Sequence, residues 1–269
     1  MGKLTDLKNL IAGIPDGACV GLGGNTLNRA PMAAVFELAK QNKRSLDIVK
    51  TAGAMDIDLL CLAGCVQSVD VGFVSYESEY SLAQHYRASV QKGLVKVNEH
   101  ACYTVISALR AASYGVPFMP VRGMIVSDLL DVNPAFKRIT DPYSGDPVTL
   151  VSAISPDYAL LHVHRADADG NAVIEGPKYE DVLLSRAARK VILTAEELVD
   201  TSYFRQSAHK ADIPGFLVAG VAHVPQGAAP CACHGCYGPD HNDIQKFLFI
   251  KNASDLLVYL ARKGEMNHA

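Results

Sequence analysis

One stretch decides the fold: Val20-Gly21-Leu22-Gly23-Gly24-Asn25-Thr26-Leu27-Asn28-Arg29-Ala30-Pro31. An apolar run leads into two adjacent glycines, and a polar segment then ends at a proline that opens an amphipathic segment. This order predicts a strand, a tight turn and a helix N-terminus, because glycine permits positive φ and proline suits the first helical turn. We call residues 23–31 the glycine elbow. Free N–H groups beyond it would favour an anionic or carbonyl oxygen, although a plain strand-to-helix turn explains the same residues.

The composition fits a soluble globular protein with an ample core. The chain has 269 residues, a formal net charge of -3 and 49% hydrophobic residues. No basic stripe is present, so nucleic acid is not an expected partner. The apolar runs are shorter than the roughly 20 residues that a membrane-spanning helix needs. The first residues lack the apolar core of a signal peptide, so we expect a cytoplasmic location. Seven cysteines, an odd number, favour free thiols over a disulfide framework.

Further along the chain, short apolar runs alternate with segments of helical periodicity. Such alternation predicts repeated βαβ units and a mostly parallel sheet. We expect one domain over residues 1–269 that ends in helices, with residues 117–147 as an ordered excursion near the active face. The expected strands are residues 18–22, 46–49, 69–74, 94–97, 158–163, 190–194 and 216–223. The expected helices are residues 4–14, 32–40, 56–63, 79–90, 101–114, 179–188, 244–250 and 253–262.

Three thiols and an imidazole lie close together in Cys231-Ala232-Cys233-His234-Gly235-Cys236. Zinc takes four nitrogen or sulfur ligands, so this segment is a candidate metal site. The second ligand pair of a structural zinc site is missing from the sequence. We therefore predict no metal, and a zinc-binding or regulatory module remains an alternative.

Acidic and imidazole side chains form two further candidates. Glu99 precedes a strongly apolar helix, where a carboxylate is expected to cap the N-terminus. Glu77 and Glu79 belong to the same acidic set, but a catalytic carboxylate pair would need a partner in space that the sequence does not show. His162 and His164 are two residues apart near the end of a core strand, so both point to one face and could line a cleft with residues 165–171. A hydrogen-bonded core histidine is the alternative for His162.

Several segments taken together resemble one family. Residues 23–31 are similar to the Gly-Gly-Phe-Thr…Arg-x-Pro segment of family I CoA transferase α subunits, in particular the α subunit of glutaconate CoA-transferase. Residues 111–122, 157–171, 212–215 and 227–237 resemble further segments of that subunit in the same order. The resemblance extends from about Leu4 to Lys246. Asn25 stands where the family has an aromatic residue, and Ala229 stands where it has histidine.

The resemblance implies a fold, a partner and a reaction. The fold would be a mixed, mostly parallel seven-stranded sheet flanked by helices. The partner would be a β subunit, with heterodimers assembling into a heterotetramer or larger. A glutamate of that subunit would attack the acyl-CoA thioester, giving a mixed anhydride and then a glutamyl-CoA thioester. The family holds no permanent cofactor, and the coenzyme A thioester is a substrate.

The same resemblance implies which residues of this chain would line the site. The elbow would supply N–H groups that hold the thioester or carboxylate oxygen as charge develops. Two arginines and two serines are candidate contacts for a substrate carboxylate. The expected site residues are Gly23, Gly24, Asn25, Thr26, Arg29, Gly53, Ser75, Ser78 and Arg122.

The sequence favours the α subunit of a two-component CoA transferase that acts on an acyl-CoA and a small carboxylate or dicarboxylate. A sub-branch of the family opens a CoA-bound ring by hydrolysis during steroid breakdown and uses an α-subunit glutamate. An ungapped count puts Cys102 at that position, and Glu99 lies one turn earlier. A hydrolase with Glu99 as its catalytic residue is therefore the alternative.

Overall fold

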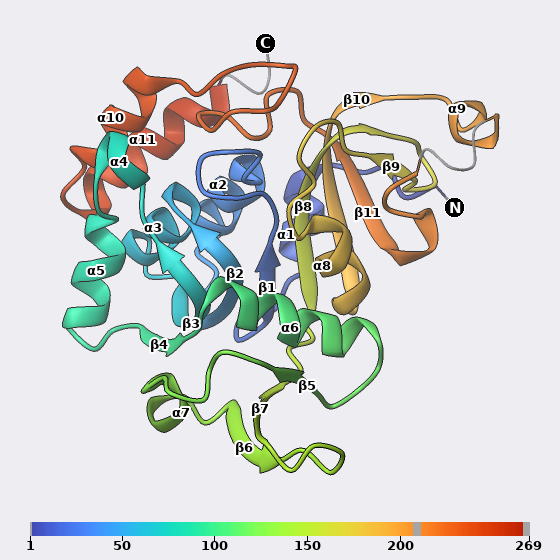
Figure 1. Ribbon diagram of the computed structural model, residues 1–269. Helices are drawn as coiled ribbons and strands as arrows, with labels where there is room; N and C mark the ends of the chain where they lie inside the picture. The colour runs from blue at the N-terminus through green and yellow to red at the C-terminus, as the bar shows by residue number, and fades with distance from the viewer. Residues whose placement is uncertain (1, 207–210, 266–269) are drawn as a thin grey trace.

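The computed structural model describes residues 2–206 and 211–265. The expected single domain spans residues 1–269, of which 1, 207–210 and 266–269 lie outside the described residues. Seven strands form one parallel path in the order β11-β10-β8-β1-β2-β3-β4 (Figure 1). The expected seven-stranded, mostly parallel sheet is confirmed, and a short eighth strand, β9 (Ala172–Val173), pairs antiparallel with β8. The seven are β1 (Cys19–Leu22), β2 (Leu46–Gly53), β3 (Val66–Val74), β4 (Lys96–Glu99), β8 (Tyr158–Ala166), β10 (Lys190–Leu198) and β11 (Val218–His223).

Helices cover both faces of this sheet because the strand side chains alternate between two cores. Along β8, Leu160 packs into one core, and Leu161 and Val163 pack into the other. The helices of the first core are α1 (Leu7–Ala12), α2 (Met32–Lys40), α3 (Met55–Leu62), α5 (Gln84–Gln91), α10 (His241–Leu248) and α11 (Ala253–Glu265). Those of the second are α6 (Cys102–Ser113) and α8 (Asp181–Ala187). Among residues 2–206 and 211–265, none of the helices is long and apolar enough to cross a membrane.

Most expected elements are found with shifted ends, and three of the differences have a clear local cause. The first helix is shorter than expected because Leu4 instead forms a bridge with Val221 of β11. The helix expected over residues 79–90 is two helices, α4 (Glu77–Tyr80) and α5, because Ser81 adopts a φ of 74° and ends α4. The strand expected from residue 216 begins at Val218, after a 3-10 turn over Gly215–Leu217.

The excursion over residues 117–147 is ordered, as expected. With the residues that follow, it forms a small antiparallel sheet in the order β5-β7-β6, with one short helix beside it. These elements are β5 (Phe118–Val121), α7 (Leu129–Val132), β6 (Phe136–Thr140) and β7 (Pro147–Ser152). In Figure 1 they lie below α6, whose Ala108 shares their small apolar core. The excursion also reaches the carboxyl end of β4, where Asn133 donates to Glu99 O at 2.8 Å and Phe136 packs against His100. Its expected place near the active face stays a prediction.

The carboxyl ends of the strands define the edge at which a site is expected. The elbow follows β1, residues 54–58 follow β2, residues 75–81 follow β3, and residues 224–240 follow β11. In open α/β sheets, ligands bind in the crevice outside this edge.

Candidate active site

The glycine elbow is a tight, folded turn. Gly24 has a φ of +69°, and a Cβ there would collide with the carbonyl of Arg29. Residues Asn25 and Asn28 bond each other through both backbone groups, at 2.9 and 2.8 Å. Thr26 and Arg29 also adopt positive φ, of 45° and 53°. Such backbone strain is common at functional sites, where the surrounding structure holds it.

Backbone N–H groups of the elbow already have acceptors within the chain. Gly23 N donates to Leu160 O at 3.0 Å, and Gly24 N donates to the Asp181 carboxylate at 2.8 Å. Thr26 N donates to Ala52 O at 3.0 Å. The expectation of free donors for an oxyanion is therefore not met by these groups. Their role toward a substrate stays a prediction that requires the elbow to move.

Two buried ion pairs hold the elbow in place. Arg29, 2% exposed, pairs with Asp181 at the start of α8 and also donates to His162 O at 2.9 Å. Lys50, also 2% exposed, donates to Gly23 O at 2.5 Å and lies 2.7 Å from the Asp56 carboxylate. Arg29 was expected to contact a substrate carboxylate, but its guanidinium is hydrogen-bonded to Asp181 and to the carbonyls of His162 and Pro177. Both pairs were missed, although a lysine inside an apolar strand is a visible signal of a buried charge.

Beside the elbow lies a pocket of about 380 Å³. Two of the expected site residues, Thr26 and Ser78, lie in its wall. Gly53 and Ser75 are not in this wall, but Ser75 directly precedes the lining residue Tyr76, and Ser75 N donates to Gly53 O at 3.0 Å. The structure thus brings together the expected residues that follow β1, β2 and β3. The lining consists of Thr26, Leu27, Asn28, Tyr76, Glu77, Ser78, Glu79, Ala232 and Pro239.

Arg122 and Glu99 lie outside this pocket. Arg122 lines a separate hollow of about 350 Å³ in the small sheet, together with Asp141 and Asp146. Glu99 is the exposed last residue of β4, and its carbonyl accepts from Asn133 at 2.8 Å. Its expected role as a helix cap is wrong, because at the start of α6 the Thr104 hydroxyl accepts from Ala101 N at 3.0 Å instead.

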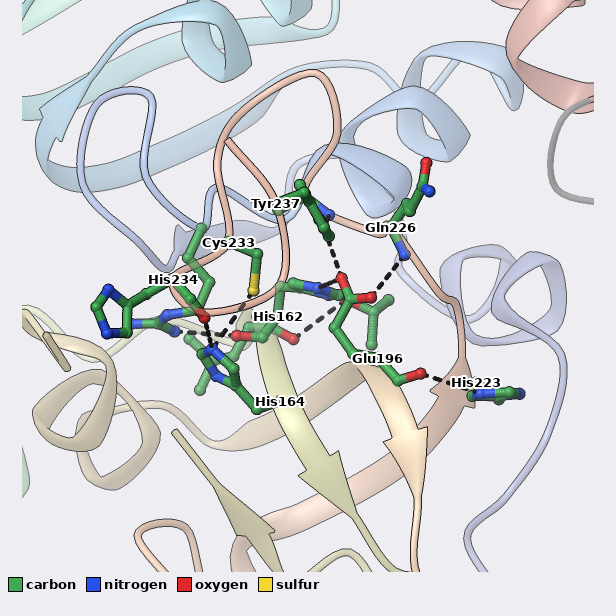
Figure 2. A network of polar contacts seen from close by, with 12 residues as sticks. His162, His164, Glu196, His223, Gln226, Cys233, His234 and Tyr237 are labelled. Atoms are coloured by element: carbon green, nitrogen blue, oxygen red, sulfur yellow. Dashed lines mark hydrogen bonds and ion pairs between the residues drawn. The ribbon is translucent and has the colours of Figure 1, made fainter. Parts of the chain in front are cut away.

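A network around Glu196 connects the sheet to the loop that covers the elbow (Figure 2). Its carboxylate accepts from His162 Nε2 at 2.6 Å, from the Tyr237 hydroxyl at 2.5 Å and from Gln226 N at 2.8 Å. Burial alone would raise the pKa of Glu196, but the hydrogen bonds from His162 and Tyr237 lower it. An ionised Glu196 thus anchors residues 226–237, whose Ala232 carbonyl accepts from Arg29 N at 2.7 Å.

The expected cleft of histidines is not formed. His162 is fully buried and bonds Thr194 Oγ1 at 2.9 Å, so the alternative of a hydrogen-bonded core histidine is correct. Arg165 instead pairs with Glu197 at 2.8 Å on the outside of the sheet. The turn over residues 167–171 is held by its own Asp167, which accepts from Asn171 N at 2.8 Å.

The candidate metal segment contributes Cys233 to two groups of possible ligand atoms in the described residues, one with His164 and Cys236 and one with His162 and Glu196. In the second group both ring nitrogens of His162 are engaged, by Glu196 and Thr194. In the described part of the chain, Cys233 and Cys236 gather with His164, their ligand atoms within 4.8 Å of one another, and Cys231 is not in this group. Glu175 N donates to His164 Nδ1 at 3.1 Å, so that nitrogen carries the lone pair and Nε2 carries the hydrogen. Nε2 then donates to His234 O at 2.8 Å, which leaves it no lone pair for a metal. His164 therefore cannot act as a ligand in this arrangement, and the expected absence of a metal stays a prediction.

The fold and its edge loops define an α/β protein with a candidate site at the carboxyl ends of parallel strands. Residues 4–223 match the Coenzyme A transferase family. The chain belongs to this family, which confirms the resemblance carried by the motifs.

Three relatives indicate how far the similarity extends. The α subunit of glutaconate CoA-transferase from Acidaminococcus fermentans is 31% identical over 258 residues, covering 90% of this chain and 81% of the relative. The cholesterol ring-cleaving hydrolase IpdA subunit of Rhodococcus jostii is 31% identical over 247 residues, covering 88% of this chain and 83% of the relative. An uncharacterized protein of Archaeoglobus fulgidus is 37% identical over 243 residues. The chain spans about half the length of that protein, 54%, in a match that covers 90% of this chain.

Two solved structures have the same fold throughout. The decarboxylase AibA/AibB, solved as a cysteine-to-serine variant, matches with a TM-score of 0.88 and 33% identity, covering 97% of this chain and 98% of that chain. Glutaconate coenzyme A-transferase from Acidaminococcus fermentans matches with a TM-score of 0.88 and 28% identity, covering 98% of this chain and 94% of that chain. One fold therefore accompanies transferase, hydrolase and decarboxylase names among similar proteins.

Asp181→Asn tests the ion pair that anchors the elbow. The change leaves the Arg29 charge buried and unpaired, so we expect the free energy of unfolding to fall by about 3–5 kcal/mol. Urea denaturation followed by circular dichroism measures it. The control is Glu197→Gln, which removes an exposed partner of Arg165 and should cost about 0–1 kcal/mol. Equal effects of the two changes would contradict a special role for the buried pair.

Asp58→Asn tests a buried carboxyl beneath the pocket. Asp58 accepts from the Tyr76 hydroxyl at 3.0 Å and from Tyr86 N at 2.7 Å, and burial raises its pKa from 3.8 to about 6. Between these values the folded chain binds more protons than the unfolded chain, so stability should fall as pH rises. Asparagine cannot ionise, so this part of the fall should be absent.

The measurement for Asp58→Asn is the urea midpoint between about pH 4 and pH 6, the interval set by that pKa shift. The exposed Asp131→Asn is the control and should keep the slope of the unaltered chain. If Asp58→Asn keeps that slope as well, Asp58 is not the titrating group.

Proposed function

We propose that this chain is the α subunit of a two-subunit enzyme that moves CoA between an acyl-CoA and a small carboxylate or dicarboxylate. The observation that carries the proposal is the 31% identity to the α subunit of glutaconate CoA-transferase over 90% of the chain. That relative is named as one subunit, which supports a second subunit here. The proposal includes a glutamyl-CoA intermediate formed on that partner.

The chemistry of the pocket supports a divided site. The strongest charges around the elbow, Arg29 and Lys50, are each engaged by a carboxylate of the same chain. Such pairs preorganise a wall but leave no free cation or nucleophile among them. The pocket offers the hydroxyls of Thr26 and Ser78 and the exposed side chain of Asn28. In the proposal these position the acyl group, and the partner supplies the reacting carboxylate.

A hydrolase acting on a CoA thioester is the second candidate. It is supported by a relative of equal identity, the ring-cleaving hydrolase subunit. A specific feature also favours it, because Glu77 and Glu79 line the pocket and a carboxylate there could act as general base toward water. Attack by water and attack by a carboxylate both develop negative charge on the thioester oxygen, so one wall could serve either reaction.

Co-expression with a β subunit tests the transferase proposal. The chain alone should be inactive, because its nucleophile would come from the partner. The complex should exchange CoA between an acyl-CoA and acetate or glutarate with ping-pong kinetics, since a covalent intermediate separates the two half-reactions. Full activity of the isolated chain, or sequential kinetics of the complex, would contradict the proposal.

Glu77→Gln and Glu99→Gln separate transferase from hydrolase in the same complex. Release of CoA without an acceptor acid is followed with a thiol reagent. Loss of a general base lowers hydrolysis by about 10²- to 10⁴-fold, so a hydrolase should respond at the residue that it uses. For a transferase, we expect exchange to change by less than about tenfold in either variant, because neither residue would be the nucleophile. A large loss of exchange in both variants would rule out this assignment of roles.

A further inference from the structure

The loop between β11 and α10 carries a C-x-x-C segment, Cys233-His234-Gly235-Cys236. It closes a tight turn, because Cys236 N and Tyr237 N each donate to Cys233 O at 3.0 Å. Gly235 adopts a φ of +72°, which the turn requires. The two sulfur atoms lie within 4.8 Å of each other. Cys233 is completely buried, and Cys236 is exposed.

We propose that Cys233 and Cys236 are a modification site at which a reversible disulfide forms within this loop. The spacing and the turn bring the two sulfurs close, and a small rearrangement of side chains would complete the bond. The exposed Cys236 thiol is accessible to a small-molecule disulfide, and the buried Cys233 thiol would act as the resolving thiol. This inference does not rest on the proposed function.

The chemistry is a pair of thiol–disulfide exchanges with a low-molecular-weight disulfide such as oxidised glutathione. The Cys236 thiolate attacks one sulfur of that disulfide, forms a mixed disulfide and releases one small thiolate. The Cys233 thiolate then attacks Cys236 Sγ, and the second small thiolate leaves. The protein loses two electrons and two protons, and the small disulfide is reduced to two thiols.

The surroundings of the two sulfurs favour this pairing over other uses. His164 Nε2 lies 3.6 Å from Cys233 Sγ but donates its hydrogen to His234 O, so the imidazole is not a metal ligand. Burial raises the pKa of Cys236, and its hydrogen bond with Cys233 offsets part of that rise. Burial also raises the pKa of Cys233 to about 12. Exchange should therefore be slow at neutral pH, and long incubations are needed.

A bond at this position would act on the wall of the candidate site. Ala232, directly before the segment, donates to Leu27 O at 2.8 Å and accepts from Arg29 N at 2.7 Å. Ala232 and His234 also line a hollow of about 190 Å³ with Arg29 and Tyr179. The oxidised loop would present a different surface beside the elbow.

Trypsin makes the test direct, because one peptide, residues 211–246, carries Cys231, Cys233 and Cys236 and no other cysteine. The full chain is incubated in glutathione buffers of increasing oxidised fraction, quenched in acid, unfolded and treated with N-ethylmaleimide. Mass spectrometry counts the adducts on this peptide. We expect three adducts under reducing conditions and one after oxidation, with the loss of two hydrogens. Reduction with dithiothreitol should restore all three.

Two variants locate the bond. Cys231→Ser should change from two adducts to none on oxidation, because Cys231 takes no part. Cys236→Ser alters an exposed side chain, so folding is preserved, and it should keep both remaining thiols without any internal bond. Three adducts on the unaltered peptide at the most oxidising ratio would overturn the proposal. So would a bond to Cys231, a stable glutathione adduct on Cys236 alone, or stoichiometric zinc that protects the thiols.

Discussion

Two buried ion pairs constrain everything else at the carboxyl edge of this sheet. Arg29 with Asp181 and Lys50 with Asp56 place four charges where almost no water reaches. Moving a charge out of water costs several kcal/mol, and only a close partner with further hydrogen bonds offsets that cost. The four side chains come from the elbow, β2, α3 and α8, so these elements can pack in few other ways. The shape of the elbow follows from this arrangement.

The same constraint explains the character of the site. Lys50 Nζ donates to the carbonyl of Gly23, and the Asp181 carboxylate accepts from the N–H of Gly24. The backbone of both glycines is therefore hydrogen-bonded to buried charged side chains. Glu196 has a similar role, since its carboxylate accepts hydrogen bonds from His162 and from Tyr237. These bonds hold the loop that contains Tyr237 next to the elbow. The result is a preformed wall beside a pocket with hydroxyl and carboxylate lining. The N–H groups of Gly23, Gly24 and Thr26 already have acceptors within the chain, so the hydroxyls and carboxylates of this lining are the groups left free to face the pocket.

The family relationship defines the scaffold more closely than the reaction. Proteins of about 30% identity over most of the chain include one subunit of a CoA transferase and one of a ring-cleaving hydrolase, and a decarboxylase structure has a TM-score of 0.88. Function resides in a few groups placed on a shared fold, so the groups that face the pocket decide the chemistry. On this chain those groups include Glu77 and Glu79, which lie shortly after β3.

The sequence by itself determined the seven parallel strands and most of the helices around them, the elbow turn and the family, because hydrophobic periodicity, glycine pairs and ordered motifs are local properties of the chain. Only the tertiary structure decided which residues pair, which are buried and which segments pack together. Arg29 meets a carboxylate 152 residues away, Glu99 is left exposed at the end of an edge strand, and Phe136 and Val151 pack against Ala108 of α6. Burial and pairing depend on which distant segments meet, and no local pattern carries that information.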